Sequence, residues 1–316
     1  EPSGRSPVGL NDGWTIEEAS KVMATELTAL AEEGVALVLL LNAACYGDMA
    51  GSRELSKRAV SITRELLDQC GLQAVTTTSP FIACEIKKAS LPVEVRASVN
   101  MRLGSIKAME YLADSFDGYY LLREWNRCPE KIREIRAWCD ERGKRLHALA
   151  NSGCLRDCAF QSFHDNIVAH EAGVARQDNI PQQFPAPCWE LVSQRENWRL
   201  VLQNTWLRPE DLHHVSGYFD TVKLATRLHS HPRRVIGAYA RQSFRGNLLD
   251  LMEPGYGPLF QGCVIDNEKF PDDWFERTST CGFQCHACDY CEQILACVLT
   301  RIMPPSDDDV GGGNAP

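Results

Sequence analysis

Four cysteines lie within the twelve residues "TCGFQCHACDYC" at positions 280–291: Cys281, Cys285, Cys288 and Cys291. Thiols at the spacing C-x3-C-x2-C-x2-C could form disulfides, bind zinc or hold an iron–sulfur cluster. Structural zinc sites usually separate two cysteine pairs by a loop of roughly a dozen residues, whereas bacterial ferredoxins bind their clusters with runs as compact as this one. The spacing therefore favours an iron–sulfur cluster, and zinc is the alternative.

The same run contains the C-x3-C-x2-C spacing of radical SAM enzymes. That motif normally follows the first strand of a barrel, and here it lies beyond the last predicted strand. Radical SAM chemistry is therefore the less favoured interpretation.

Composition narrows the class of protein. The chain has 316 residues, fourteen cysteines and a net charge of −9, which argues against binding to nucleic acid or to anionic lipid. Its longest apolar run, "VALVLLL" at 35–41, is too short to span a bilayer, and no signal-peptide pattern is visible. We therefore expect a cytoplasmic protein, in which clustered cysteines more often bind metal or perform redox chemistry than form disulfides.

Strand-like and helix-like segments alternate along the chain. The predicted strands are 35–41, 74–78, 93–97, 118–122, 146–150, 203–207 and 221–225. The predicted helices begin with a Thr15–Glu18 capping box and continue at about 54–69, 80–89, 105–115, 129–142, from Pro209, and at 232–245. This alternation predicts βαβ units and a parallel sheet, in which an apolar run such as 35–41 is buried on both faces. Seven strands suit an open doubly wound sheet, whereas a barrel needs eight.

Polar residues and cysteines follow the predicted strands. Because active sites of parallel α/β folds lie at the C-terminal ends of the strands, we expect these side chains to meet at one rim. They are Asn42, Cys45, Tyr46, Asn100, Arg123, Glu124, Asn151, Cys154, Cys158 and Arg227. Taken singly, each asparagine could instead be a helix cap or turn former, and the cysteines could be scattered buried thiols.

Two further residues lie in the long irregular stretch after the fifth predicted strand. Cys188 stands in "PAPCWE", and a segment of this length without regular structure is usually functional. His164, in "FHDNIVAHE", could be a general acid or a metal ligand, or simply lie on a helix surface.

Segments 79–126, 151–158 and 205–227 together resemble the peptidase U32 family. "NSGCLRDC" stands where that family places its first cluster cysteines, and "TWLRPEDLHHVSGYFDTVKLATR" resembles its "LSPxDL…LKIEGR" segment. The resemblance covers about two thirds of the chain. It departs from the family pattern at "KLATR", which keeps Lys223 and Arg227 but loses the acidic residue of "KIEGR".

The resemblance implies a TIM-like (β/α) barrel, here without its first strand, followed by a cysteine-rich appendage. Similar members act in oxygen-independent hydroxylation and carry a [4Fe–4S] cluster on four cysteines. Carried over by position, Cys154, Cys158 and Cys188 would be ligands, with Cys45 as the fourth; the run at 281–291 would hold a second cluster, complete the first, or bind zinc.

From these features we predict an iron–sulfur oxidoreductase that hydroxylates a small, anionic molecule. Glu124, His164 and Tyr46 would be catalytic, while Asn42, Asn100, Arg123, Lys223 and Arg227 would bind substrate. An electron-donor protein and a homologous subunit are the expected partners, with no membrane or nucleic acid. The alternatives are a U32-type peptidase or hydrolase and a non-catalytic iron–sulfur subunit.

The predicted domain organisation follows from the same features. Residues 1–14 are read as a loop, 15–250 as the U32-like barrel, 251–304 as the cysteine-rich extension and 305–316 as a disordered tail, because "PSDDDVGGGNAP" has almost no apolar content.

Overall fold

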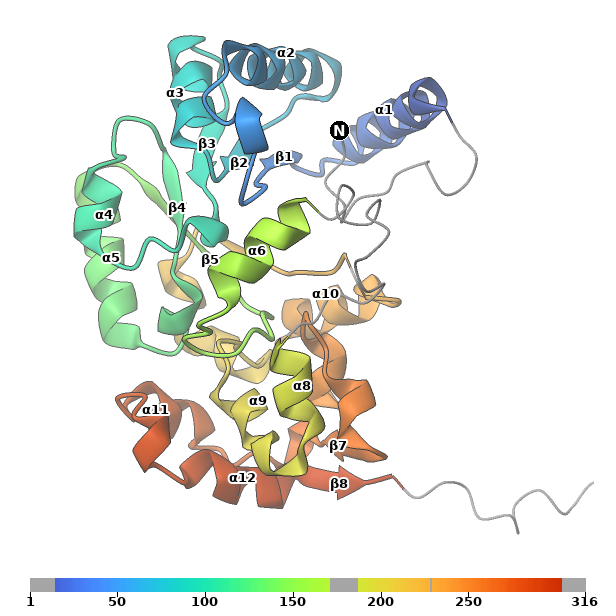
Figure 1. Ribbon diagram of the computed structural model, residues 1–316, viewed down its shortest axis with the longest axis vertical. Helices are drawn as coiled ribbons and strands as arrows, with labels where there is room; N and C mark the ends of the chain where they lie inside the picture. Colours follow the sequence, from blue (N-terminus) through green and yellow to red (C-terminus); the bar gives the residue numbers. More distant parts are fainter. Residues whose placement is uncertain (1–14, 171–186, 228, 303–316) are drawn as a thin grey trace, which may run out of the picture. The chain divides into compact units, whose positions relative to one another are not determined.

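The computed structural model describes residues 15–170, 187–227 and 229–302 (Figure 1). The chain forms two compact units. Unit 1 comprises residues 1–149, 158–184 and 215–223, and unit 2 comprises residues 150–157, 185–214 and 224–316. The predicted tails at 1–14 and 305–316 lie outside the described residues, and the predicted boundary at residue 250 stays a prediction.

Unit 1 is a parallel sheet with its helices. The strands are β1 (Val38–Leu41), β2 (Ala74–Thr77), β3 (Glu94–Ala97), β4 (Gly118–Tyr120), β5 (Arg145–Leu149) and β6 (Thr221–Lys223). The helices are α1 (Ile16–Glu32), α2 (Arg53–Cys70), α3 (Pro80–Lys88), α4 (Ile106–Glu110), α5 (Pro129–Glu141) and α6 (Gln161–Ala169). Local sequence fixes their ends: the predicted capping box of Thr15 and Glu18 is confirmed, and Gly71 ends α2 with a positive φ of 64°.

The six strands follow one another in chain order, β1-β2-β3-β4-β5-β6, and every neighbouring pair is parallel. A doubly wound sheet reverses its strand order at a switch point, whereas strands added always on the same side are typical of a (β/α) barrel. The fold is therefore mixed α/β with a singly wound parallel sheet. Closure into an eight-stranded ring remains a prediction.

The two faces of this sheet differ in chemistry. One face is apolar and includes Val75, Val95, Tyr119 and Ala148, all fully buried. Tyr119 packs edge-on against Trp138 of α5, with ring centroids 5.6 Å apart, and its hydroxyl donates to a carbonyl of α4. The helices therefore cover the apolar face, and the opposite face carries polar side chains.

Strand β1 differs from the prediction of a strand buried on both faces. Val38 and Leu40 point to one side and are 37% and 38% exposed. In the described residues β1 pairs only with β2, so it is an edge strand. With a neighbouring strand on one side alone, its side chains are less covered than those of the inner strands.

The predicted strand at 203–207 is wrong. Residues 199–203 form the short helix α9 (Arg199–Gln203), and 204–207 are irregular. The apolar side chains of this segment serve a different core: Trp206 is 1% exposed and stacks on Trp274 with centroids 6.1 Å apart. Burial of that indole explains an apolar pattern that resembles a strand.

Unit 2 consists of short elements around this aromatic core. They are α8 (Pro187–Ser193), α9, α10 (Pro232–Arg241), α11 (Trp274–Ser279), α12 (Tyr290–Val298) and the antiparallel pair β7 (Cys263–Ile265) and β8 (Leu299–Arg301). Helices α9 and α12 pack together and are joined by an Arg199–Glu292 ion pair of 3.3 Å.

Among the described residues, no helix combines the length and the apolar character that crossing a membrane requires.

Candidate functional site

The polar face of the sheet in unit 1 carries a buried charged cluster, which we call the sheet-face cluster: Glu94, Arg96, Tyr120, His147 and Lys223. One Glu94 oxygen lies 2.9 Å from His147 Nε2, and the other accepts from Arg96 at 2.7 Å. The side chains of Glu94 and Arg96 are 10% exposed, and His147 is fully buried. The Lys223 ammonium lies 5.6 Å from the centre of the Tyr120 ring.

Neighbouring charges decide the ionisation of Glu94. Burial alone would raise its pKa, but hydrogen bonds from His147 and Arg96, together with the Arg96 charge, lower the pKa to about 2. Burial raises the pKa of Tyr120 despite the nearby Arg96. The cluster therefore holds an ionised carboxylate and a neutral phenol at neutral pH.

Glycine at position 118 makes the Glu94–His147 contact possible. Strand β4 runs between β3 and β5, so the two side chains must meet across it. A Cβ at Gly118 would lie 2.5 Å from a Glu94 oxygen and 2.8 Å from His147 Nε2. Only a residue without a side chain leaves this path open.

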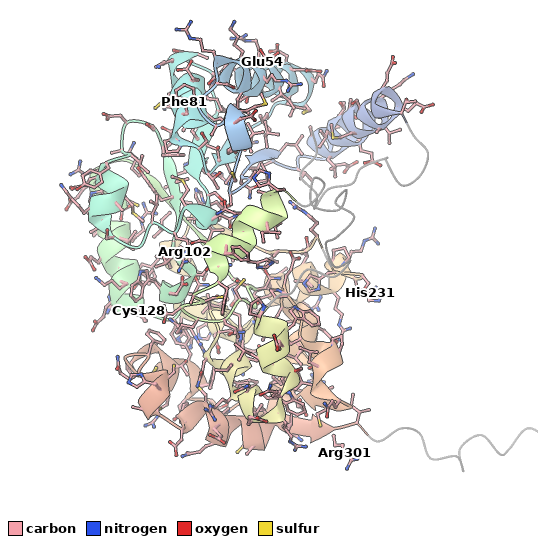
Figure 2. The ribbon with its side chains drawn as sticks, viewed as in Figure 1. Glu54, Phe81, Arg102, Cys128, His231 and Arg301 are labelled. Carbon is pink, nitrogen blue, oxygen red and sulfur yellow. The ribbon has the colours of Figure 1, made fainter. Side chains whose placement is uncertain are left out.

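The strand ends of unit 1 hold most of the substrate-binding and catalytic residues predicted from the sequence. Asn100 lies 3.5 Å from the carbonyl of Asn42, so these two residues are brought together. Arg123 and Glu124 are consecutive and buried, and Glu124 lies 3.6 Å from Arg102, which Figure 2 labels. These contacts agree with a common rim, but they do not test the predicted roles.

Two further residues predicted to be catalytic, Tyr46 and His164, make different contacts from those of Arg123 and Glu124. The Tyr46 hydroxyl donates to the Leu41 carbonyl at 2.5 Å, and burial raises its pKa. His164 is half-buried on α6. Arg227 is exposed and belongs to unit 2, unlike Lys223 of unit 1.

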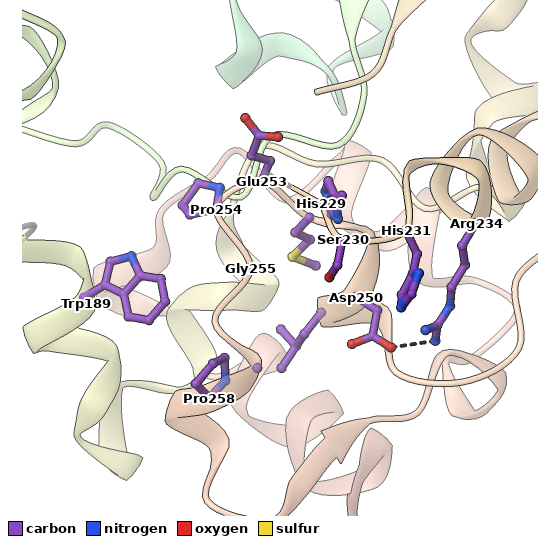
Figure 3. Close-up of a pocket in the computed structure, with 13 residues that line it drawn as sticks. Trp189, His229, Ser230, His231, Arg234, Asp250, Glu253, Pro254, Gly255 and Pro258 are labelled. Atoms are coloured by element: carbon purple, nitrogen blue, oxygen red, sulfur yellow. Dashed lines mark hydrogen bonds and ion pairs between the residues drawn. The ribbon is translucent and has the colours of Figure 1, made fainter. Parts of the chain in front are cut away.

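Unit 2 contains a pocket of about 450 Å³, which we call the His229 pocket (Figure 3). Its lining is Trp189, His229, Ser230, His231, Arg234, Leu249, Asp250, Met252, Glu253, Pro254, Gly255, Gly257 and Pro258. In Figure 3, Trp189 stands on one side and the two histidines on the other. The cavity combines an apolar wall with charged and hydrogen-bonding side chains, and such a combination can hold a small ligand.

His229 has the protonation state that general-base chemistry needs. Burial lowers its pKa below the ordinary value, while the carboxylates of Glu253 and Asp250 act in the opposite direction. Its buried Nε2 atom has no hydrogen-bond partner among the described residues. The imidazole is therefore neutral at neutral pH, next to carboxylates that would stabilise its protonated form.

The backbone around the pocket is held by Asn151, whose polar character the sequence had already singled out. Its side chain accepts from the Ala225 amide at 2.7 Å and donates to the Ala225 and Leu251 carbonyls at 2.6 and 2.9 Å. Gly153 then donates to the Glu253 carbonyl at 2.9 Å. Asn151 thus ties together the segments that lead to His229 and to Glu253, and it has a positioning role.

The fourteen cysteines all lie in described residues. Of the predicted ligands, Cys45 and Cys158 belong to unit 1, whereas Cys154 and Cys188 belong to unit 2, as does the run at 281–291. Cys285 lines a second cavity, of about 340 Å³, with His286 and Arg156. Cys281 donates to the Thr278 carbonyl at 3.3 Å, and Cys288 is exposed.

In the part of the chain that the structure describes, no group of three His, Cys, Asp or Glu side chains is arranged to hold a metal ion. The iron–sulfur clusters and the zinc site stay predictions, and we derive no chemical step from a metal.

Sequence reasoning missed most of the sheet-face cluster and the whole His229 pocket. A signal for the cluster was present: "VEVRA" and "RLHALA" place charged residues or histidine at alternate positions of strands otherwise read as buried. Period-two polarity in a parallel sheet marks one polar face. The pocket gave no such signal, because its lining comes from three separate segments, at 189, 229–234 and 249–258.

Comparison with known proteins gives a sequence relative that covers most of this chain. The chain is 26% identical over 283 residues to a Methanocaldococcus jannaschii protein named "Uncharacterized protease MJ1657". The alignment covers 86% of this chain and 80% of that protein. A solved structure titled "The Structure of the U32 Peptidase Mk0906" superposes with a TM-score of 0.48 and 15% identity, covering 66% of this chain and 74% of the other. No protein-family model matches. The relationship to the archaeal protein, which is named a protease, spans the stretch that carries the U32-like motifs.

Proposed function

We propose that the protein is a U32-type hydrolase that cleaves peptide bonds in the His229 pocket. The observation that carries the proposal is a neutral imidazole at the wall of a 450 Å³ cavity, with carboxylates nearby. The name of the archaeal relative, a protease, supports the same class of reaction. Hydrolysis was the alternative interpretation of the sequence, and it now takes precedence over redox hydroxylation.

In the proposed reaction, His229 takes a proton from water as the water oxygen attacks the peptide carbonyl carbon. The carbon–nitrogen bond then breaks, and the imidazolium returns the proton to the departing amine. Glu253 and Asp250 stabilise the imidazolium between these two steps, since both act to raise the pKa of His229. Trp189, Met252 and Pro254 form the apolar wall that would hold a substrate side chain.

The test is hydrolysis of a mixed peptide library by the purified protein, followed by mass spectrometry. His229→Gln should reduce kcat by about 10²–10⁴-fold, which is the usual contribution of a general base. The matched control is His213→Gln, because His213 is exposed on the surface of unit 2 and does not line the pocket. Equal activity of the wild type and His229→Gln would overturn the proposal.

The pH profile gives a second readout. Only the neutral imidazole can accept a proton, and burial lowers the pKa of His229 below its ordinary 6.5. Activity should therefore persist as the pH falls through 6.5 and decline only at lower pH, and this acid limb should disappear in His229→Gln.

An iron–sulfur redox enzyme is the second candidate, because Cys281 and Cys288 are exposed and Cys285 lines a cavity. In this candidate one or two [4Fe–4S] clusters, or zinc at Cys281–Cys291, would be present. This candidate also requires an electron-donor protein and a homologous subunit as partners. Its substrate would be a small anion bound by Arg123, Lys223 and Arg227.

Iron, sulfide and zinc content per chain, measured on anaerobically purified protein, tests this candidate. Cys285→Ser or Cys288→Ser should remove about half the iron if there are two clusters. Cys297→Ser is the control, because Cys297 is exposed on α12 outside the run. Unchanged iron with stoichiometric zinc would favour the zinc alternative, and the absence of both metals would remove the candidate.

We further propose that the sheet of unit 1 is part of a TIM-like barrel, that the cysteine-rich run is an appendage to it, and that the protein is cytoplasmic. The consecutive strand order supports the first of these proposals.

A further inference from the structure

We propose that the polar face of the sheet in unit 1 is a binding site for a small oxyanion, a carboxylate or phosphate group. This site goes beyond the proposed hydrolase function and lies in the unit that does not contain the His229 pocket. The proposal rests on buried polar atoms that lack protein partners on this face.

Three such atoms occur on the polar face: Thr76 Oγ1, Arg96 Nε and His147 Nδ1. None has a hydrogen-bond partner among the described residues, and the three residues are only 1%, 8% and 0% exposed. A buried polar atom without a partner is costly, so native proteins rarely leave one without water or a ligand. Of the three, Thr76 Oγ1 and Arg96 Nε can donate, and together they indicate a shared occupant that accepts hydrogen bonds.

Register places these residues on the same face. Thr76 is the direct partner of Arg96 in the β2–β3 pair, so their side chains project side by side. Arg96 is in turn the partner of Gly118, over which the His147 ring passes. The missing side chain at Gly118 leaves the middle of this face uncovered by β4.

The charge of the face favours an anion. Glu94 is the acidic member, and both of its oxygens are already engaged, by His147 on one side and by Arg96 and Arg145 on the other. Arg96, Arg145 and Lys223 therefore leave an excess of positive charge. A carboxylate or phosphate could accept hydrogen bonds from Arg96 Nε and from the Thr76 hydroxyl, because guanidinium groups bind both oxyanions well.

The experiment is thermal unfolding and calorimetric titration of the full chain with sodium acetate and, separately, sodium phosphate, at ionic strength held constant with chloride. Saturable binding should raise the Tm of the wild type. Acetate binding without phosphate binding would identify a carboxylate, and the reverse would identify a phosphate.

Thr76→Val removes only the hydroxyl group. Without added anion it should unfold at the same Tm as the wild type or higher, because a buried hydroxyl without a partner is lost. With anion, it should bind about fivefold more weakly, as expected for one lost hydrogen bond. Arg96→Lys keeps the charge but loses Nε, and it should weaken binding by about tenfold or more.

Thr77→Val is the matched control, because Thr77 is the next residue in β2 and lies on the opposite face. Its hydroxyl accepts from the Ser79 amide at 3.0 Å, so this variant should lose stability but keep anion affinity. Two results would overturn the proposal: no saturable binding of either anion, which would mean that the face holds water only, or unchanged binding in Thr76→Val. Neither result depends on peptide hydrolysis, so this proposal and the proposed function can fail separately.

Discussion

Two histidines, His147 and His229, both lie near carboxylates but differ in burial and in hydrogen bonding. His147 is fully buried and lies 2.9 Å from an ionised Glu94. His229 lines a cavity, and the carboxylates near it make no hydrogen bond to its Nε2 among the described residues. A histidine and a carboxylate therefore form a fixed structural pair in one unit and a group able to exchange protons in the other.

The difference teaches that access, more than residue type, separates a structural pair from a reactive one. A hydrogen bond to a buried carboxylate is costly to break, since the charge then loses a partner. A half-exposed pair such as Arg234–Asp250 can exchange partners with water or substrate at little cost. The following predictions test this contrast.

Gly118→Ala should have the largest effect, because a Cβ would collide with both members of the Glu94–His147 pair. Losing a hydrogen bond to a buried carboxylate costs about 3 kcal/mol, so the free energy of unfolding should fall by about that amount in denaturant titrations. Gly217→Ala is the control, since a Cβ there would meet no atom within 4 Å. Equal stability of the two variants would show that the Glu94–His147 pair accommodates the added Cβ at little cost in free energy.

Asn151→Ala should have the next largest effect, on the unit that contains the pocket. It removes three hydrogen bonds, of which one is buried and two are partly buried, and leaves the Ala225 amide without its side-chain partner, so the free energy of unfolding should fall by about 2–3 kcal/mol. Asn166→Ala, at an exposed position of α6, should change stability little. A neutral Asn151→Ala would mean that the pocket segments are held by other contacts.

Lowering the pH should affect the His229 pocket and the Glu94–His147 pair at different pH values. The pKa of Glu94 is lowered to about 2, so its stabilising contribution is complete above its ordinary pKa of 4.5 and is lost only as the pH falls toward 2. The pKa of His229 is lowered from its ordinary 6.5, so peptide hydrolysis should decline only below pH 6.5, while circular dichroism still reports a folded protein. Loss of hydrolysis and of the folded circular dichroism signal at the same pH would contradict the proposed difference between His229 and the Glu94–His147 pair.

Arg234→Gln should have the smallest effect on stability. Its ion pair with Asp250 has side chains 46% and 38% exposed, and such pairs contribute below about 1 kcal/mol. A loss of stability comparable to that of Gly118→Ala would mean that the pocket pair is as constrained as the buried one.

Sequence patterns predicted the regular part of the fold and little of the pocket. The strands around Val75, Val95 and Leu146 and the Thr15 capping box have local signals, because alternation and capping depend on neighbours along the chain. The segment at 203–207 was misread, since burial of Trp206 in an irregular core gives the same apolar pattern as a strand. His229 and Glu253 were missed because tertiary contacts alone bring their segments together.

The strand order has a consequence for how the sheet assembles. Neighbours β2 to β5 are each joined by a short stretch of chain with one helix, so their pairing closes small loops at low entropic cost. Strand β6 pairs with β5 only after the chain has passed through residues 150–214, most of which belong to the other unit. Its docking closes the longest loop in the sheet, with three residues of pairing in return. Strand β6 should therefore join last during folding and exchange its amide hydrogens first in the native protein.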